Sequence, residues 1–172
     1  INEDSTLTEL LRGTDSDGDN ITYSASVSSG SATVDGSTLT VTPSQDYNGD
    51  ITVSVTASDG SLTDSGSFTL TVNAVNDAPT VAATQSVSTN EDTVLNFNLT
   101  AGSDIDADTL SYIKVSDPAS GSVTCTGGTS RACTYTPANN FNGATSFTYK
   151  VNDGNLDSNT ATVTITINSV ND

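Results

Sequence analysis

Apolar and polar residues alternate with a period of two through much of the chain. The clearest alternations cover residues 21–27, 51–57, 68–72, 147–151 and 161–167, and shorter ones cover residues 39–41 and 95–99. Strict alternation is typical of β-strands with one buried face, and no segment carries a sustained helical period. Turn-forming pairs separate the alternating segments, and we expect them in hairpin turns: Asp35–Gly36, Asn48–Gly49, Asp59–Gly60, Asn142–Gly143 and Asp153–Gly154.

The landmarks of the first half recur in the same order in the second half. Asn2–Asp4 matches Asn90–Asp92, and Asp15–Tyr23 matches Asp104–Tyr112. The distance between matched positions grows from 88 (90 − 2) to 95 (171 − 76), which places insertions in turns. An ordered set of matches of this kind indicates two copies of one unit. The remaining matches are Tyr47–Gly49 with Phe141–Gly143, Asp59–Gly60 with Asp153–Gly154, and Asn76–Asp77 with Asn171–Asp172.

Each copy contains about seven short strands in roughly 80–95 residues, a pattern typical of a Greek-key β-sandwich. We therefore predict an all-β protein of two tandem sandwich domains, residues 1–77 and 78–172. The first copy begins abruptly at Ile1–Asp4, so we expect it to be N-terminally truncated and the chain to be a piece of a larger protein. The junction Val75–Pro79 is short and contains one proline, unlike a flexible linker rich in Gly and Ser.

The chain is strongly acidic, with 21 Asp and Glu against 4 Lys and Arg, a net charge of -17 and no His. Such a surface repels phosphate backbones and anionic lipid, so we expect neither a nucleic-acid partner nor a membrane-surface partner. No apolar run approaches the length of a transmembrane segment, and we expect no direct membrane insertion. A uniformly acidic surface aids solubility in salty surroundings, whereas clustered carboxylates need a cation.

Two cysteines, Cys125 and Cys133, lie in strand-like arms on either side of a Gly127–Gly128 turn. Their sulfurs can face each other across a hairpin. The alternative is a reactive or metal-binding thiol pair, but the chain has no His and no Cys-x-x-Cys spacing. A structural disulfide is therefore favoured, and with it an oxidising compartment outside the cytoplasm.

Three carboxylates alternate along one expected loop, at Asp104, Asp106 and Asp108. Alternate residues of an extended segment point the same way, so these side chains can converge on one point. Hard oxygen ligands suit Ca²⁺, whereas Zn²⁺ favours the His that this chain lacks and Mg²⁺ retains its waters. The sequence favours a calcium loop here over a solvated surface loop.

The matching segment Asp15–Asp19 resembles the opening of an EF-hand loop, but the later positions do not fit. Asn20 and Thr109 stand where an EF-hand requires Gly, and Ser26 and Val115 stand where it requires Glu. The flanking segments are also expected to be strands rather than helices. The EF-hand is therefore rejected.

The acidic landmarks occur in a fixed order. An early Glu comes first, and Asp-x-Asp follows just before a strand. Ala-x-Asp-Gly or its equivalent comes late in the copy, and Val-Asn-Asp-Ala-Pro stands at the junction. In this combination the chain resembles, in two copies, the cadherin-like repeats of large bacterial surface proteins and adhesins. The resemblance implies cadherin- or immunoglobulin-like sandwiches with Ca²⁺ between successive domains. It assigns the interdomain ligands Glu3, Asp46, Asn76, Asp77, Asp104, Asp106 and Asp153, an N-terminal set of Asp15, Asp17 and Asp59, and a C-terminal set of Glu91, Asn171 and Asp172, with Asp19 and Asp108 as additional candidates.

The chain departs from the cadherin pattern in two respects. The Asp-Arg-Glu triplet is absent, because Gln45–Gly49 and Asn139–Gly143 stand in its place, and the junction has fewer acids. One or two ions per junction are therefore expected rather than three. Asp59 and Asp153 are equally compatible with plain turns, although their matched placement favours ligands.

The leading functional hypothesis is a calcium-binding extracellular adhesion or spacer module, in which Ca²⁺ at the junction stiffens a tandem array on a bacterial surface. Its partners are then the neighbouring repeats of the parent chain, with a surface polysaccharide or a homophilic partner as further possibilities. The alternative is a carbohydrate-binding module of a secreted polysaccharide-active or adhesive protein. Enzymatic activity is not expected, because the chain has no His, no nucleophile elbow and no phosphate loop.

Overall fold

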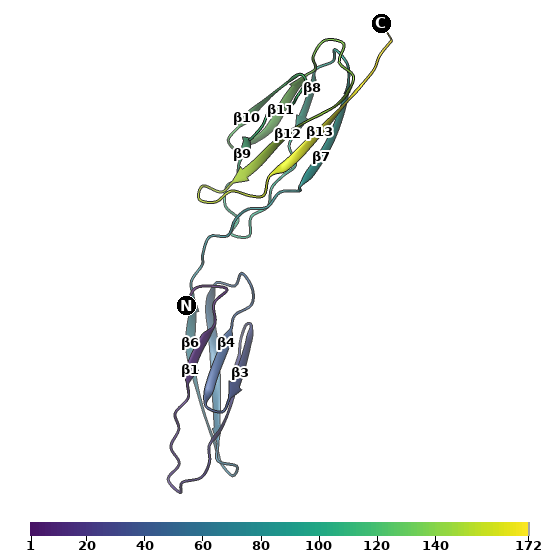
Figure 1. The fold of residues 1–172 in the computed structure, drawn as a ribbon. Coiled ribbons are helices and arrows are strands. Elements are labelled where there is room, and N and C mark those ends of the chain that lie inside the picture. The colour runs from purple at the N-terminus through teal and green to yellow at the C-terminus, as the bar shows by residue number, and fades with distance from the viewer. Residues whose placement is uncertain (172) are drawn as a thin grey trace. The chain divides into compact units, whose positions relative to one another are not determined.

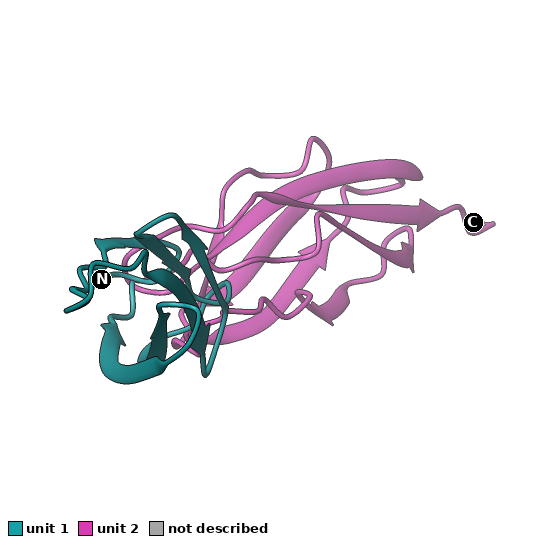
Figure 2. Cartoon of the chain, turned by 90° about the horizontal axis from the view of Figure 1, so that it is seen from below, with its two compact units in different colours: residues 1–75 teal, residues 76–172 magenta. Residues whose placement is uncertain are grey.

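The computed structural model describes residues 1–171, and it divides them into two compact units. Unit 1 comprises Ile1–Val75, and unit 2 begins at Asn76 (Figure 2). The division falls two residues before the boundary expected from the repeat. All regular elements of the described residues are β-strands, so the prediction of an all-β protein with two tandem sandwiches is confirmed.

Unit 1 packs two three-stranded sheets against each other (Figure 1). One sheet has the order β1-β4-β3 and the other has the order β2-β5-β6, with antiparallel neighbours throughout. The strands are β1 (Leu7–Leu10), β2 (Thr22–Val27), β3 (Ser31–Asp35), β4 (Thr38–Thr42), β5 (Gly49–Ser58) and β6 (Thr63–Val72).

Unit 2 repeats this arrangement with one strand more (Figure 1). Its sheets have the orders β10-β11-β8 and β7-β13-β12-β9, and β7 is parallel to β13. The strands are β7 (Thr84–Asn90), β8 (Leu95–Asn98), β9 (Ser111–Lys114), β10 (Ser122–Gly127), β11 (Ser130–Thr136), β12 (Gly143–Asn152) and β13 (Ala161–Asn168).

The apolar positions of the alternating segments form a separate core in each unit. In unit 1, Leu39 and Ile51 are fully buried, and in unit 2, Phe147 and Tyr149 are fully buried. The hydroxyl of Tyr149 donates to the carbonyl of Thr100 at 3.2 Å, which satisfies the polar end of this ring. The period of two in the sequence thus places one face of each strand inside a sandwich.

The two units differ at the edge that β7 covers in unit 2. Gln85 on β7 donates to the carbonyl of Asn98 at 2.8 Å and accepts from the N–H of Thr100 at 2.9 Å, which closes one side of the sandwich. The corresponding edge of unit 1 has only the parallel bridge between Asn2 and Asn73. Unit 1 consequently has six strands among the described residues and unit 2 has seven.

The expectation of hairpin turns at the Asn-Gly pairs is wrong. Asn48–Gly49 lies at the start of β5, after the chain leaves β4, and Asn142–Gly143 lies at the start of β12, after the chain leaves β11. Each of these strand pairs spans the two sheets of one unit, so the chain crosses the sandwich there instead of reversing within a sheet. Asp35–Gly36, in contrast, does lie in the hairpin between β3 and β4.

Cys125 and Cys133 form the expected disulfide across the β10–β11 hairpin. They occupy directly opposite positions of the two strands, with Cα atoms 4.1 Å apart. Among residues 1–171, no helix has the length and apolar character needed to span a membrane.

Candidate metal centre

The loop that leads into β9 brings three carboxylates together in unit 2. Asp104, Asp106 and Asp108 each place one oxygen within 4.8 Å of the others. The turn is tight, because Ala107 has a φ of 63° and the N–H of Asp108 donates to Oδ1 of Asp104 at 3.2 Å. The sequence spacing therefore produces the convergence that a cation site requires.

The first two residues of unit 2 are held against the same loop and its neighbour. The backbone N–H of Asp77 donates to Oδ2 of Asp106 at 2.8 Å. The side-chain amide of Asn76 donates to Oδ2 of Asp153 at 2.9 Å. Asn76, Asp77, Asp106 and Asp153 thus lie together at one end of the sandwich of unit 2.

Asp153 is held as a carboxylate by its own loop. Its Oδ1 accepts the backbone N–H groups of Asn155 and Leu156, each at 2.6 Å. The hydrogen bond from the Leu156 N–H, followed by that from the Asn76 amide, lowers the pKa of Asp153 from 3.8. The side chain is therefore ionised at neutral pH and available as an oxygen ligand.

Unit 2 offers these carboxylates little positive charge. Its two lysines are paired elsewhere, Lys114 with Asp117 and Lys150 with Asp157 at 2.5 Å. Its one arginine, Arg131, donates to the carbonyl of Leu99 at 3.1 Å. Oδ2 of Asp104 is buried and accepts no hydrogen bond from residues 1–171. A buried carboxylate oxygen without a donor is costly unless a cation approaches it. The donor set is entirely oxygen, which fits Ca²⁺.

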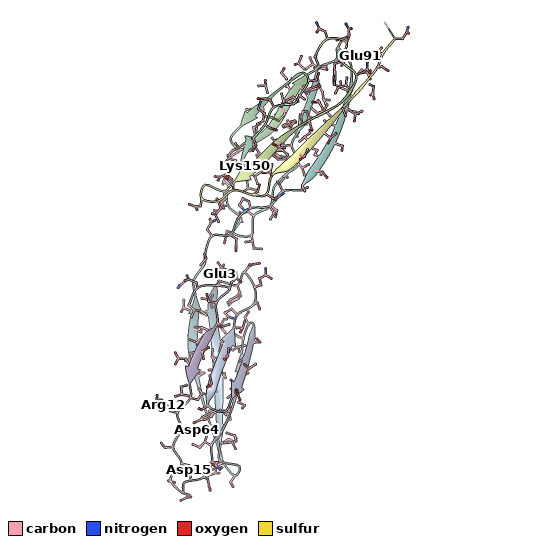
Figure 3. All side chains as sticks on the ribbon, in the orientation of Figure 1. Glu3, Arg12, Asp15, Asp64, Glu91 and Lys150 are labelled. Atoms are coloured by element: carbon pink, nitrogen blue, oxygen red, sulfur yellow. A yellow bond between two sulfur atoms is a disulfide. The ribbon has the colours of Figure 1, made fainter. Side chains whose placement is uncertain are left out.

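A second kind of site is a buried glutamate near one end of each unit. Glu3 is 5% exposed and Glu91 is 7% exposed. Oε1 of Glu91 accepts the backbone N–H of Val170 at 2.6 Å, and Oε1 of Glu3 accepts the N–H of Val75 in the same way. In Figure 3, Glu3 and Asp15 lie at opposite ends of unit 1, and Glu91 lies at an end of unit 2.

The loop at Asp15 does not repeat the convergence seen at Asp104. Among the residues that the structure describes, Asp15, Asp17 and Asp19 do not gather their carboxylates into one group. Oδ1 of Asp15 instead accepts the N–H groups of Asp17 at 2.8 Å and of Asp19 at 3.1 Å. Asp59 lines a hollow of about 310 Å³ together with Asp15, so two of the three predicted N-terminal ligands lie near each other.

Asp59 sits in a loop built like that of Asp153. Its Oδ1 accepts the N–H groups of Ser61 at 2.7 Å and Leu62 at 2.6 Å. These bonds, that from Leu62 first, lower the pKa of Asp59. Of the predicted C-terminal ligands, Asn171 is exposed, and Asp172 lies outside the described residues.

A family model described as bacterial Ig domain matches residues 1–71 and again residues 76–166. The chain belongs to the bacterial Ig domain family. Each of the two units is therefore one bacterial Ig domain. A search of curated proteins found no match.

Among solved structures, two-domain fragments of human protocadherins share this fold. Human mucin-like protocadherin EC1-2 is 18% identical with a TM-score of 0.57, and the match covers 99% of this chain and 94% of that chain. Human protocadherin-24 EC1-2 is also 18% identical with a TM-score of 0.57, covering 95% and 88%. The expected likeness to tandem cadherin repeats is confirmed at the level of fold.

A larger protein also matches along nearly the whole chain. An endo-fucoidan hydrolase from glycoside hydrolase family 107 is 24% identical with a TM-score of 0.47, covering 99% of this chain. The two Ig domains span 27% of the length of that hydrolase.

The Ig domains also hold two aspartates that sequence analysis did not place in a site. Oδ1 of Asp4 accepts the N–H of Asp46 at 3.2 Å, and Oδ1 of Asp92 accepts the N–H of Asn140 at 3.1 Å. These four residues have φ between 53° and 57°, a left-handed conformation that Asp and Asn adopt more readily than other side chains. Their signal in the sequence was the repeat of Asn-Glu-Asp at Asn2–Asp4 and Asn90–Asp92.

Proposed function

We propose that the two Ig domains form a calcium-binding spacer or adhesion module, in which Ca²⁺ binds where the chain passes from unit 1 to unit 2. The observation that carries the proposal is the convergence of Asp104, Asp106 and Asp108 beside Asn76 and Asp77. The ligand set is the one expected from the resemblance, with Asp108 included. Its members are Glu3, Asp46, Asn76, Asp77, Asp104, Asp106, Asp108 and Asp153.

Electrostatics supports a bound cation over a bare cluster. Two unit charges about 4 Å apart repel by about 1 kcal/mol in water and by about 4 kcal/mol at an effective dielectric of 20. Asp104, Asp106 and Asp108 form three such pairs within 4.8 Å. A divalent ion converts this repulsion into attraction, at the affinity of about 10⁻⁴–10⁻³ M that is typical of extracellular calcium modules.

Each end of the connection is already held by its own unit. Val75 donates its N–H to Glu3 in unit 1, and Asp77 donates its N–H to Asp106 in unit 2. Between these two residues, the side-chain amide of Asn76 donates a hydrogen bond to Asp153 in unit 2. Ca²⁺ that binds Asp77 and Asp104 fixes the backbone of the connection and thereby limits the rotation of one domain relative to the other.

The disulfide and the bacterial Ig family support an extracellular location on a bacterial surface. The immediate partners in this proposal are neighbouring repeats of the parent chain. The outer ends of the two domains, with Asp15 and Asp59 on one side and Glu91 on the other, would provide ligands toward those neighbours. Catalysis forms no part of the proposed function.

Nuclear magnetic resonance relaxation tests the stiffening. We expect the amides of the two domains to report one common rotational correlation time in Ca²⁺ and two shorter, separate times after chelation. Asp104→Asn should reproduce the chelated behaviour in the presence of Ca²⁺, whereas Asp35→Asn, in the β3–β4 hairpin, should not. Correlation times that are the same with and without Ca²⁺ would contradict the proposed mechanism.

A further inference from the structure

The outer face of sheet β10-β11-β8 in unit 2 has a hollow of about 340 Å³, at the lower end of the ~300–1,000 Å³ range of small-molecule sites. The middle strand β11 forms its floor, where the short side chain of Ala132 faces outward opposite Asn98. β10 and β8 flank β11 in this sheet (Figure 1). Side chains of these two strands form the walls of the hollow. We call this hollow the amide–hydroxyl trough; its outward-facing residues are Asn96, Asn98, Thr124, Thr126, Ala132 and Thr134.

The polar groups of the trough are all uncharged, although the chain carries 21 Asp and Glu. Thr134 donates its hydroxyl hydrogen to Oδ1 of Asn96 at 2.7 Å, which orients the amide and leaves both of its N–H groups for another acceptor. The threonine hydroxyls both donate and accept. We infer that the amide–hydroxyl trough binds a neutral saccharide, whose hydroxyls match these groups in both roles.

Other classes of ligand fit the trough less well. The central strand β11 is paired with β10 on one side and β8 on the other, so its backbone cannot accept an added peptide strand. The lining has no carboxylate for a cation and no basic side chain for an anion. The net charge of -17 further disfavours sulfated or carboxylated polymers.

The floor and walls of the trough are fixed by two local devices. The register of β10 and β11 shifts between Cys125 and Gly127, so Arg131 and Ala132 form a bulge on β11 opposite Thr126 on β10, a feature that re-aims side chains. The Cys125–Cys133 disulfide joins the same two strands directly beneath. Because the two strands are already held in place, their side chains lose less conformational entropy when a ligand binds.

Unit 1 lacks these features and serves as an internal control. The position of Ala132 corresponds to Thr38 on β4, which lies between Leu10 on β1 and Asp35 on β3. This row carries one apolar and one acidic side chain, and unit 1 has no cysteine. A saccharide should therefore select the sheet of unit 2.

The test is a titration of the ¹⁵N-labelled 172-residue chain with neutral hexasaccharides of glucose, of mannose and of galactose, in chelator and again in Ca²⁺. At least one should bind saturably, with Kd on the order of 1 mM because no aromatic ring stacks on the sugar. We expect shifts confined to the backbone of β8, β10 and β11 and the side-chain amides of Asn96 and Asn98, equal in both buffers. Independence from Ca²⁺ separates this site from the proposed junction.

Ala132→Glu should weaken the binding by about tenfold or more, because it fills the floor and adds a charge. Asn98→Ala should weaken it severalfold without altering the floor. Thr38→Glu, at the matched position of unit 1, should leave the affinity unchanged, and an unperturbed spectrum of the remaining residues confirms that each variant folds. The inference is overturned if none of the hexasaccharides binds up to about 50 mM, if Ala132→Glu binds as well as the parent chain, or if a sulfated fucose oligosaccharide binds these residues instead.

Discussion

Oε1 of Glu91 accepts the backbone N–H of Val170 at 2.6 Å, and the side chain that makes this bond is only 7% exposed. Glu3 accepts the N–H of Val75 in the same position of unit 1 and is 5% exposed. A buried carboxylate near the start of each domain thus binds the chain segment that leaves the same domain. Because the arrangement occurs twice, it belongs to the domain itself.

A buried glutamate without a cation should destabilise the domain. We expect Glu91→Gln to raise the free energy of unfolding of unit 2 by about 1 kcal/mol in chelator, because the amide keeps an acceptor for Val170 and removes the charge. Thermal melting in chelator measures this change. Glu9→Gln, at an exposed position of β1, is the control and should have little effect. A destabilised Glu91→Gln would mean that the charge itself is needed for the fold.

Calcium should raise the melting temperature of the chain. If Kd is about 0.1 mM, about 10 mM Ca²⁺ adds about 2.7 kcal/mol to the free energy of unfolding of the domain that holds the ion. For a domain of this size the shift is several degrees or more. Calorimetric scans in Ca²⁺ and in chelator measure it, with Mg²⁺ as the matched ion. Scans that coincide in all three conditions would contradict calcium binding to the native state.

The pKa of Asp153 should depend on Asn76. Asn76→Ala removes the amide that donates to Oδ2, so the pKa of Asp153 should rise, while the N–H of Leu156 still holds it below 3.8. A lowered folded-state pKa contributes stability above pH ~3.8 that is lost as the pH falls through the folded value, and the variant should lose part of that contribution. Carboxyl carbon shifts between pH 2 and 6 report the titration.

Asp59 is the internal control for that titration, because its loop has the same two backbone donors and lies in unit 1. The pKa of Asp59 should be the same in the parent chain and in Asn76→Ala. If the pKa of Asp153 did not move in Asn76→Ala, the hydrogen bond between Asn76 and Asp153 would not persist in solution.

Removing the disulfide should destabilise unit 2 selectively. The paired replacement of Cys125 and Cys133 by Ser should lower the free energy of unfolding of unit 2 by about 2–3 kcal/mol, the value expected for so short a loop. Amide hydrogen exchange, read separately for each domain, measures the effect. The slowest-exchanging amides of unit 1 should be unchanged, and an equal loss in both domains would contradict independent cores.

Strong alternation in the sequence was sufficient to predict β2, β5, β6, β12 and β13, and shorter alternations at 39–41 and 95–99 predicted β4 and β8. The arms of the cysteine hairpin predicted β10 and β11. The remaining strands, β1, β3, β7 and β9, are short or carry few apolar residues. In β7, Val87 is the one large apolar side chain, and the strand is held mainly by parallel pairing to β13. Pairing with a distant strand leaves no local period in the sequence, so such a strand is recognised only in the folded domain.

The two Asp-x-Asp loops show that the same spacing predicts a cluster of carboxylates correctly in one unit and not in the other. Both have three aspartates at alternate positions, but only Asp104, Asp106 and Asp108 converge. In unit 2 the N–H of Asp77 holds Asp106, whereas within the described residues of unit 1 the carboxylate of Asp17 accepts no hydrogen bond. The arrangement of the carboxylates in an acidic loop thus depends on a hydrogen-bond donor that is distant in sequence. The amide–hydroxyl trough likewise depends on three strands and a bulge.

Calorimetric titration of the intact chain with Ca²⁺, after stripping with a chelator, tests the central claim most directly. We predict saturable binding with Kd between about 10⁻⁴ and 10⁻³ M. Binding should be abolished by Asp104→Ala, weakened by Asp77→Ala, and retained by Asp35→Ala in the β3–β4 hairpin. An absence of saturable heat, or equal binding by Asp104→Ala and the parent chain, would show that the acidic loop of unit 2 is a solvated turn and not a calcium site.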